Sequence, residues 1–268
     1  QAMVYSALAT GDFFGLEAGN TILNCLPVKY VAGKMMFIRA FILGLEMDFV
    51  APSSHPLELI EKQYDFTAMV PLQAENSIDK LHLFKKIIIG GAKVSKELEK
   101  KLKPVKASIY ETFGMTETIS HIAARKLGAH SFTVFPDINI SVDANNCMII
   151  KAKNISNKAI KTNDVIELIA ENEFKFIGRF DNVINSGGIK LFPEQIEGKL
   201  SKIIKKRFFV MGKPDKELGE HLVLVVEGEK QEIDFSTIES LEKFEKPKEI
   251  IFLNKFKETE NGKIIREV

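Results

Sequence analysis

Short apolar runs and helix-like segments alternate between residues 22 and 110, and this alternation is the strongest constraint on the fold. An apolar run at 22–26 ends at a proline, and strands are expected at 46–50, 67–70, 86–89 and 107–110. Helices are expected at 31–43, 55–63 and 95–102, the second with Ser54 as its cap. This alternation predicts an α/β fold with a mostly parallel sheet covered by helices.

The pattern changes twice further along the chain. After about residue 130 it predicts a small antiparallel sheet or barrel-like subdomain, with strands at 131–135, 138–142, 147–151, 165–169 and 174–177. After Asp181 it predicts a compact α+β module, with helices at 193–204 and 235–244 and strands at 207–211, 222–227 and 249–253. We therefore expect one domain at 1–180, divided near residue 130, and a second domain at 181–268.

Composition and charge exclude several kinds of protein. The 268 residues are 45% hydrophobic and 27% charged, an ordinary globular mix. The net charge of +1 gives no electrostatic preference for nucleic acid or for an anionic membrane. No uncharged apolar stretch is long enough to span a membrane, and residues 1–10 lack the pattern of a secretory signal. Cys25 and Cys147 lie far apart, so we expect a cytoplasmic protein with two free thiols.

Residues 110–118 read YETFGMTET and follow an apolar run, so they would lie where a strand ends and open α/β sheets bind ligands. Gly114 lets the backbone approach a ligand closely. Phe113 offers a flat face to a base, Thr116 a hydroxyl to a phosphate, and Glu117 a carboxylate to Mg²⁺. The alternative is a polar turn before a capped helix, and the spacing alone does not decide between the two.

Four other segments are ordinary when each is taken alone. Residues 178–190, GRFDNVINSGGIK, stand at the second change of pattern and could be a linker with a Gly-Gly turn. Residues 261–263, NGK, predict a hairpin turn. Residues 162–164, TND, precede an expected strand, and residues 90–92, GGA, could form a tight turn between a strand and a helix.

In this order and spacing, the five segments together resemble the motifs of the adenylate-forming superfamily of acyl- and aryl-CoA ligases, luciferases and peptide-synthetase adenylation domains. The resemblance covers the whole chain and implies that ATP, Mg²⁺ and coenzyme A take part. It implies a nucleotide site that includes the GGA loop and the YETFGMTET segment, with Glu117 as the magnesium carboxylate. The residues to which it assigns nucleotide contacts are Gly90, Gly91, Ala92, Phe113, Gly114, Thr116, Asp164 and Arg179.

The resemblance also implies a mobile C-terminal domain. Asp181 matches the hinge about which that domain turns, and Gly187 and Gly188 match a loop that lines the tunnel for the CoA thiol arm. Lys263 matches the lysine that holds the carboxylate and phosphate oxygens during adenylation. The implied catalytic groups are thus Lys263, Thr116 and Glu117.

One motif of the superfamily has no counterpart in this sequence. A Ser/Thr/Gly-rich phosphate loop would be expected shortly before the helix that begins near Met3. The resemblance therefore implies an adenylate-forming fold truncated at its N-terminus, and we expect this chain by itself to adenylate weakly or not at all.

Residues 26–40, LPVKYVAGKMMFIRA, indicate which acid is activated. They resemble the o-succinylbenzoate–CoA ligases of menaquinone biosynthesis, whose substrate carries two carboxylates. Arg39 lies in a largely apolar helix and could hold the carboxylate that is not activated, or it could pair with a structural carboxylate or reach outward. Lys34 is a weaker alternative, and Gly91 and His121 are further candidates for the acid pocket.

The implied reaction has two halves, formation of an acyl adenylate from ATP and then transfer of the acyl group to the CoA thiol. Partners would be a small carboxylic acid, ATP and CoA, with no nucleic acid or membrane and with a possible homodimer. One alternative keeps the fold and changes the acid to another aryl or acyl group. Another is a nucleotide-binding or interaction module without catalysis, as the missing phosphate loop could suggest.

Overall fold

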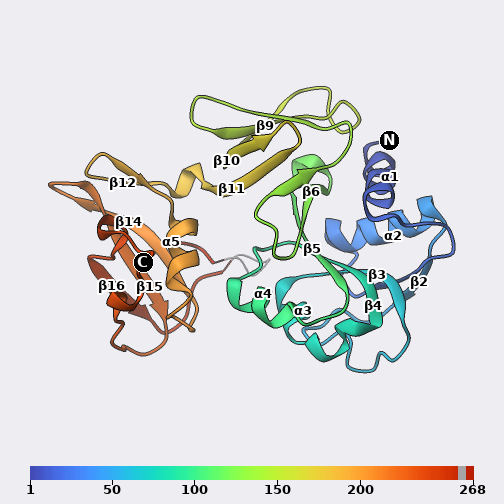
Figure 1. Ribbon diagram of the computed structural model, residues 1–268, viewed down its shortest axis with the longest axis horizontal. Helices are drawn as coiled ribbons and strands as arrows, with labels where there is room; N and C mark the ends of the chain where they lie inside the picture. Colours follow the sequence, from blue (N-terminus) through green and yellow to red (C-terminus); the bar gives the residue numbers. More distant parts are fainter. Residues whose placement is uncertain (259–263) are drawn as a thin grey trace.

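The structure, a computed structural model, describes residues 1–258 and 264–268. A mixed sheet of eleven strands forms the larger part, and a five-stranded sheet forms a separate C-terminal module (Figure 1). The strand order of the large sheet is β2-β1-β3-β4-β5-β6-β7-β11-β10-β9-β8. The α/β fold class expected from the sequence is confirmed, and so is the α+β character of the C-terminal part.

Five parallel strands make up one half of the large sheet. They are β1 (Thr21–Asn24), β2 (Glu46–Phe49), β3 (Tyr64–Met69), β4 (Phe84–Ile89) and β5 (Ser108–Gly114). Side chains on β4 alternate between two buried clusters, because successive residues of a strand point to opposite faces. Ile88 joins the cluster that contains helix α2 (Val31–Leu43) and part of α1 (Ala2–Phe14). Ile87 and Ile89 join the cluster with α3 (Pro71–Glu75) and α4 (Lys96–Leu102), so helices cover both faces.

Antiparallel strands make up the other half of the large sheet. They are β6 (His121–Lys126), β7 (Phe132–Val134), β8 (Asn139–Val142), β9 (Cys147–Lys151), β10 (Ile160–Ala170) and β11 (Glu173–Arg179). β6, a strand not expected from the sequence, pairs with both β5 and β7. The β-rich segments therefore continue the parallel half instead of forming the small separate sheet that we expected.

The C-terminal module begins after β11. It consists of β12 (Ile184–Ser186), β13 (Ile189–Leu191), α5 (Pro193–Leu200), β14 (Phe208–Asp215), β15 (Gly219–Glu227) and β16 (Glu249–Leu253). Its two buried clusters draw only on residues from Ile184 onward, whereas the clusters of the large sheet end at Phe176. This separation agrees with a boundary near Asp181, although the division into domains stays a prediction.

The helix expected at 55–63 was wrong. The segment forms turns instead, and side chains from later segments bind a backbone carbonyl at its start and another near its end. The Asn76 amide donates to the Ser54 carbonyl at 3.0 Å, and the Lys80 ammonium donates to the Ile60 carbonyl at 3.1 Å. Tertiary contacts have therefore overridden a local helix preference.

The helix expected at 235–244 was also wrong. Two single 3₁₀ turns stand there, Phe235–Thr237 and Lys243–Glu245. The Glu245 carboxylate accepts from the backbone of Glu242 at 2.9 Å and from Lys199 on α5 at 2.6 Å. These contacts tie the second turn to α5. Within the described chain, no helix is both long enough and apolar enough to cross a membrane.

Candidate active site

The ends of β4 and β5 lie side by side and carry the first group of expected residues. A Cβ on Gly90 would come within 2.6 Å of the Thr112 hydroxyl, so a larger residue there would have to displace Thr112. Gly91 has a φ of 82°, in the left-handed region that glycine favours. Gly91 and Ala92 are exposed, so this loop presents backbone groups at the edge of the sheet.

Phe113 is half-buried in an aromatic group that joins β5 to β7 and β11. Its ring centroid lies 5.1 Å from that of Phe174 and 5.9 Å from that of Phe132, both edge to face. Phe176 lies 6.0 Å away. These contacts fix the orientation of the Phe113 ring, and its exposed part can still stack on a flat ligand.

Gly114 and Thr118 shape the turn that follows β5. A Cβ at position 114 would lie 2.4 Å from both the Cα of His121 and the carbonyl oxygen of Ser120, so only glycine fits there. The buried Thr118 hydroxyl accepts from the Met115 N–H at 3.0 Å. The turn continues as a 3₁₀ helix, Thr116–Thr118, on which Thr116 and Glu117 are exposed.

The Glu117 carboxylate beside the Thr116 hydroxyl fits Mg²⁺ in one particular way. Magnesium in proteins usually takes one or two carboxylates and fills its other positions with substrate phosphates and water. Among the described residues, no three His, Cys, Asp or Glu side chains are grouped to hold a metal ion. A single exposed carboxylate therefore suits a magnesium ion that binds together with a phosphorylated ligand.

Strands β10 and β11 bring together Asp164, Arg179 and Asp181. Asp164 lies opposite Arg179 across the two strands. The Arg179 guanidinium donates to the Asp164 carboxylate at 3.3 Å and to the Asp181 carboxylate at 3.0 Å. Burial raises the pKa of Asp164 above its ordinary value, although Arg179 opposes that shift. The Asp164 carboxylate is a buried acceptor and the Arg179 guanidinium a half-exposed donor. Such a pair can bind the two hydroxyls of a ribose, since a hydroxyl both donates and accepts.

Arg39 on α2 is buried without a carboxylate partner. Only 2% of its surface is exposed, and one guanidinium nitrogen donates to the Ser120 hydroxyl at 2.8 Å. Its Nε has no hydrogen-bond partner among the described residues, and no ion pair to Arg39 is found there. Burial lowers the pKa of Arg39 to about 10. Arg39 is therefore a cation held inside the protein at a large desolvation cost.

His121 lies beside Arg39 and is tied to α1. Burial, with a smaller effect of the Arg39 charge, lowers the pKa of His121 well below its ordinary value, so the ring is neutral at pH 7. The Thr10 hydroxyl donates to the Ser6 carbonyl at 2.7 Å and therefore has no hydrogen left for the ring. At 3.0 Å it must accept from His121 Nε2–H, which leaves Nδ1 as the unprotonated nitrogen.

Lys34, the other cation considered for the acid pocket, is exposed on α2. It forms no ion pair with a described residue, whereas Arg39 is buried one and a half turns further along the helix. The structure therefore brings Arg39, and not Lys34, to Ser120 and His121.

Gly187 and Gly188 lie in the C-terminal module, at the turn between β12 and β13. Their φ angles are 59° and 81°, and the Gly187 N–H donates to the Leu218 carbonyl at 2.8 Å. A Cβ on Gly188 would meet nothing within 4 Å. Asp181 stands in the 3₁₀ turn Phe180–Asn182 that links the large sheet to this module. Lys263 lies outside the described residues.

Two polar residues near Arg39 were not singled out from the sequence. Thr10 is a hydroxyl residue in a largely apolar helical segment, and this was the signal available in the sequence. The structure shows that the Thr10 side chain is buried. Ser120 directly precedes His121, but only the fold shows that Arg39 reaches it. Both belong with Arg39 and His121 in what we call the arginine pocket.

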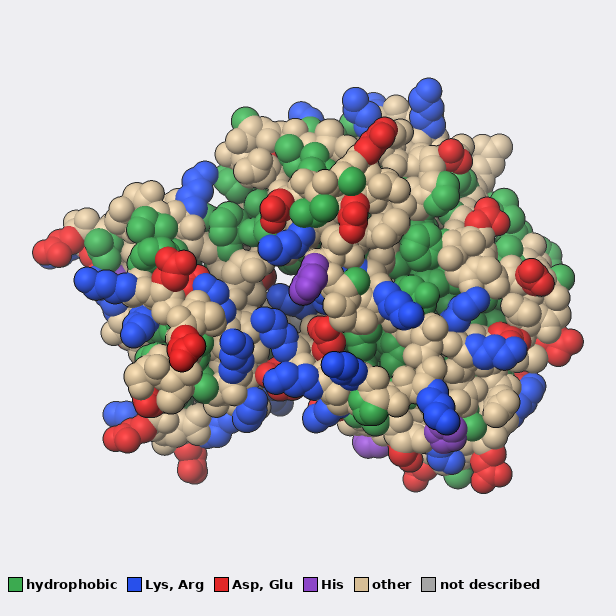
Figure 2. Space-filling view, viewed as in Figure 1, with side chains coloured by type: hydrophobic (Ala, Val, Ile, Leu, Met, Phe, Trp, Pro, Cys, Tyr) green, Lys and Arg blue, Asp and Glu red, His purple; other side chains and the backbone are tan. Residues whose placement is uncertain are grey.

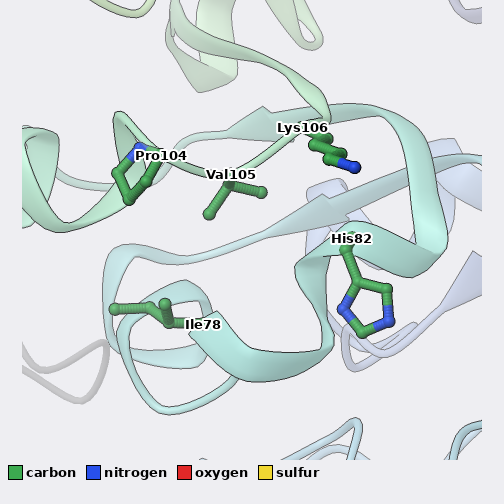
Figure 3. Close-up of a pocket in the computed structure, with 5 residues that line it drawn as sticks. All are labelled: Ile78, His82, Pro104, Val105 and Lys106. Atoms are coloured by element: carbon green, nitrogen blue, oxygen red, sulfur yellow. The ribbon is translucent and has the colours of Figure 1, made fainter.

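A shallow hollow of about 410 Å³ lies elsewhere, lined by Ile78, His82, Pro104, Val105 and Lys106 (Figure 3). These residues precede β4 and β5, so the hollow stands at the edge where the parallel strands begin. The expected ligand residues stand at the opposite edge, where the strands end. The hollow is therefore not part of the candidate site.

Comparison with known proteins assigns this chain to a family. Residues 1–153, more than half of the chain, match the AMP-binding enzymes. The chain belongs to that family. A solved member, the acyl-CoA synthetase (AMP-forming)/AMP-acid ligase II-like protein of Dyadobacter fermentans, is 34% identical, with 99% of this chain and 81% of that one covered and a TM-score of 0.65.

Two further relatives of this AMP-binding enzyme are informative. The 2-succinylbenzoate–CoA ligase of Lactococcus lactis is 24% identical over 97% of this chain and 64% of its own length. The chain thus spans less than two thirds of that curated relative. The o-succinylbenzoate CoA synthetase (MenE) of Bacillus subtilis, solved with ATP and magnesium, is 18% identical with a TM-score of 0.84, over 99% of this chain and 64% of that one. At this identity the similarity shows the fold alone.

Proposed function

We propose that this AMP-binding enzyme is the greater part of an ATP-dependent acid–CoA ligase, and that its acid is o-succinylbenzoate. The enzyme would form an acyl adenylate and pyrophosphate, and then an acyl-CoA thioester and AMP. Relatives named 2-succinylbenzoate–CoA ligase, 24% and 26% identical to this chain, support the choice of acid.

The single observation that carries the proposal is that Arg39 is buried and has no carboxylate partner among the described residues. o-Succinylbenzoate has one carboxylate to activate and a second that must be held. A buried carboxylate pairs well with a guanidinium, and the pair offsets the desolvation of both charges. Ser120 accepts from the same guanidinium and would keep it oriented while the ligand is absent. The neutral His121 leaves the pocket with one positive charge, which matches one carboxylate.

The nucleotide would bind between the end of the parallel strands and β10–β11. Gly90, Gly91, Ala92, Phe113 and Gly114 would contact the adenine and the acyl group. Asp164 and Arg179 would bind the ribose, since their carboxylate and guanidinium lie 3.3 Å apart on paired strands. Thr116 would donate to the phosphate of the adenylate.

In the first half-reaction, stabilisation of the developing negative charge would contribute most of the rate acceleration. A carboxylate oxygen attacks the α-phosphorus, the bond to pyrophosphate breaks, and negative charge spreads over the phosphate oxygens. Magnesium held by Glu117 would supply a cation for the pyrophosphate, and Lys263 would supply another. In the second half-reaction the CoA thiol attacks the acyl carbon and AMP leaves. The C-terminal module would first rotate about Asp181, which would bring Gly187 and Gly188 beside the thiol arm of CoA.

The test is an assay of the full-length gene product with ATP, Mg²⁺, CoA and o-succinylbenzoate, in which AMP and acyl-CoA are followed. Arg39→Ala should raise KM for o-succinylbenzoate by about 10-fold or more, because a buried charge-assisted hydrogen bond contributes about 1.5–3 kcal/mol. KM for ATP should change little. Lys263→Ala should slow adenylation while transfer of a preformed acyl adenylate to CoA continues.

The outcomes separate the alternatives. Turnover with benzoate or a fatty acid, and none with o-succinylbenzoate, would keep the ligase and discard the acid. No turnover with any acid, together with tight binding of ATP, would favour a nucleotide-binding module without catalysis.

A further inference from the structure

The backbone of the candidate site contains one residue in an unfavourable conformation. Over the large sheet, on the face in view in Figure 2, acidic and basic side chains are interspersed as on an ordinary solvated surface, and their charge points to no particular ligand. Three described residues other than glycine have a positive φ, namely Ile119, Asp137 and Asn146. Of these three, only Ile119 lies in the segment that joins Glu117 to the arginine pocket.

Ile119 is the central residue of a γ-turn. The Ser120 N–H donates to the Thr118 carbonyl at 2.7 Å, and Ile119 has a φ of 67° and a ψ of −51°. A γ-turn with a positive φ at its centre is rare and strained. Aspartate and asparagine tolerate a positive φ, whereas a β-branched side chain such as isoleucine meets steric conflict there. Such conformations persist only where the surrounding structure holds them, and they cluster at functional sites.

Contacts on both sides hold this turn in place. The buried Thr118 hydroxyl accepts from the Met115 N–H and lies 2.8 Å from the Ser120 carbonyl, to which it can donate. Gly114 has no Cβ, which lets the same Ser120 carbonyl pass close to β5. Gly114 also pairs with His121 in the sheet, so the chain is fixed after the turn as well. The strained conformation is therefore imposed by its neighbours.

The turn connects the two proposed ligand sites. On one side, the Ile119 N–H donates to the Thr116 carbonyl at 3.0 Å and closes the 3₁₀ helix that carries Glu117. On the other side, the Ser120 hydroxyl accepts from Arg39 at 2.8 Å. A change of chain direction at Ile119 would therefore move Glu117 relative to Ser120.

We propose that Ile119 is a positioning residue, whose strained turn holds Glu117 and Ser120 in one relative orientation, so that Mg²⁺ with its phosphates and the acid meet in a fixed geometry. Glycine would adopt either sign of φ at little cost and would leave this orientation loosely defined. The other conformations open to isoleucine lie at negative φ and would redirect the chain. Groups that are already oriented need no reorganisation during the reaction. The inference rests on the proposed function, which supplies the two ligands.

The experiment compares ligand binding by the full-length gene product and by its Ile119→Gly variant. The affinity for a fluorescent ATP derivative is measured in Mg²⁺ and in EDTA, and the affinity for o-succinylbenzoate by calorimetry. Ile119→Val is the conservative variant, because it keeps a β-branched side chain and hence the strain. Asn146→Gly is the matched control, since it places glycine at another positive φ, in the exposed turn between β8 and β9.

Ile119→Gly should weaken ATP binding in Mg²⁺ by about 10-fold or more, as is usual when a residue that orients a metal ligand is replaced. Binding in EDTA should weaken much less, because Glu117 reaches ATP only through the metal. The affinity for o-succinylbenzoate should fall as well, since Ser120 would no longer hold Arg39 in place. Ile119→Val and Asn146→Gly should bind all of these ligands like the unchanged protein.

Thermal denaturation separates positioning from packing. The melting temperature of Ile119→Gly should be no lower than that of Ile119→Val, because glycine relieves the strain at positive φ. A residue needed only for packing would instead lose affinity and melting temperature together in Ile119→Gly, and that result would overturn the inference.

Unchanged ATP and acid affinities in Ile119→Gly would also overturn it. So would an equal loss of ATP affinity in Mg²⁺ and in EDTA, which would indicate general damage to the site, and an equal loss in Ile119→Val, which would assign the effect to side-chain contacts. If the unchanged protein binds ATP with Mg²⁺ but does not bind o-succinylbenzoate, the acid of the proposed function is rejected. The Mg²⁺-dependent ATP affinity of Ile119→Gly would still decide the inference, since its loss supports positioning and its retention overturns it.

Discussion

Burying Arg39 lowers the stability of the folded protein. A buried charge without a carboxylate partner costs several kcal/mol unless a ligand compensates it. Arg39 has only the neutral Ser120 hydroxyl as a partner in the described structure. Residues that lower stability in this way are more easily explained by ligand binding than by packing.

Replacing Arg39 with methionine should therefore separate stability from function. Arg39→Met removes the buried charge and retains an unbranched apolar chain. We expect the free energy of unfolding to rise by about 1–3 kcal/mol, measured by urea denaturation. The same variant should lose affinity for o-succinylbenzoate. A fall in stability would mean that Arg39 holds the fold together, contrary to its proposed role.

His121 should make the protein sensitive to mild acid. Its pKa is depressed in the folded state, so below the unfolded pKa of about 6.5 the unfolded chain binds a proton that the folded chain does not. Stability from this group is complete above pH 6.5 and is lost as pH falls, by up to about 1.4 kcal/mol per pH unit. His121→Gln should remove this part of the slope between pH 6.5 and 5, measured by urea denaturation at each pH. An unchanged slope in His121→Gln would mean that another group causes the sensitivity to acid.

The sequence pointed to Arg39 as a candidate site residue but not to the side chains that surround it. Arg39 was identified because a charge stands within an apolar helix, which is a local signal. Thr10 and Ser120 were missed because their roles depend on contacts across 111 and 81 residues of sequence. No local pattern contains that information.

Among the elements, those with strong apolar patterns were predicted most closely. Helix α2 spans Val31–Leu43, as expected. Helix α4 spans Lys96–Leu102, close to the expected 95–102, and Ser95 caps it by accepting from the Leu98 N–H at 3.0 Å. The expected helix at 55–63 lies where side chains from later segments bind the local backbone, and at 235–244 the Glu245 side chain binds Lys199 of α5 and the Glu242 N–H. Strand β6 was missed because its pairing is set by neighbours in the sheet.

Gly114 should be the least replaceable glycine of the site elements. Gly114→Ala would place a Cβ 2.4 Å from backbone atoms of Ser120 and His121, which cannot rotate away. We expect it to destabilise the protein by about 2 kcal/mol or more and to weaken ATP binding, because β6 must move away from β5. Gly198→Ala on α5 is the matched control, since its Cβ meets nothing within 4 Å. That variant should gain about 0.5–1 kcal/mol from helix propensity. Equal effects in thermal denaturation and ATP titration would contradict this interpretation.

At the scale of the whole molecule, one sheet joins the parallel and antiparallel strands while the C-terminal module has its own core. The pairing of β6 with β5 and β7 makes the larger part a single hydrogen-bonded unit. The sequence pattern suggested a change near residue 130, whereas antiparallel pairing begins between β5 and β6, because strand pairing is a long-range property that the local pattern does not contain.

Two separate cores should unfold in two separate steps. Leu81 belongs to a buried cluster of the large sheet and Leu224 to one of the C-terminal module, and both are fully buried. Each Leu→Ala substitution should cost its own unit about 2–5 kcal/mol, because it removes contacts and leaves a cavity. Scanning calorimetry should therefore show that Leu224→Ala lowers only the transition of the C-terminal module, and Leu81→Ala only that of the large sheet. A single transition lowered equally by both would mean that the contacts between α5 and β11 couple the two parts into one cooperative unit, and the predicted boundary at Asp181 would then have no thermodynamic meaning.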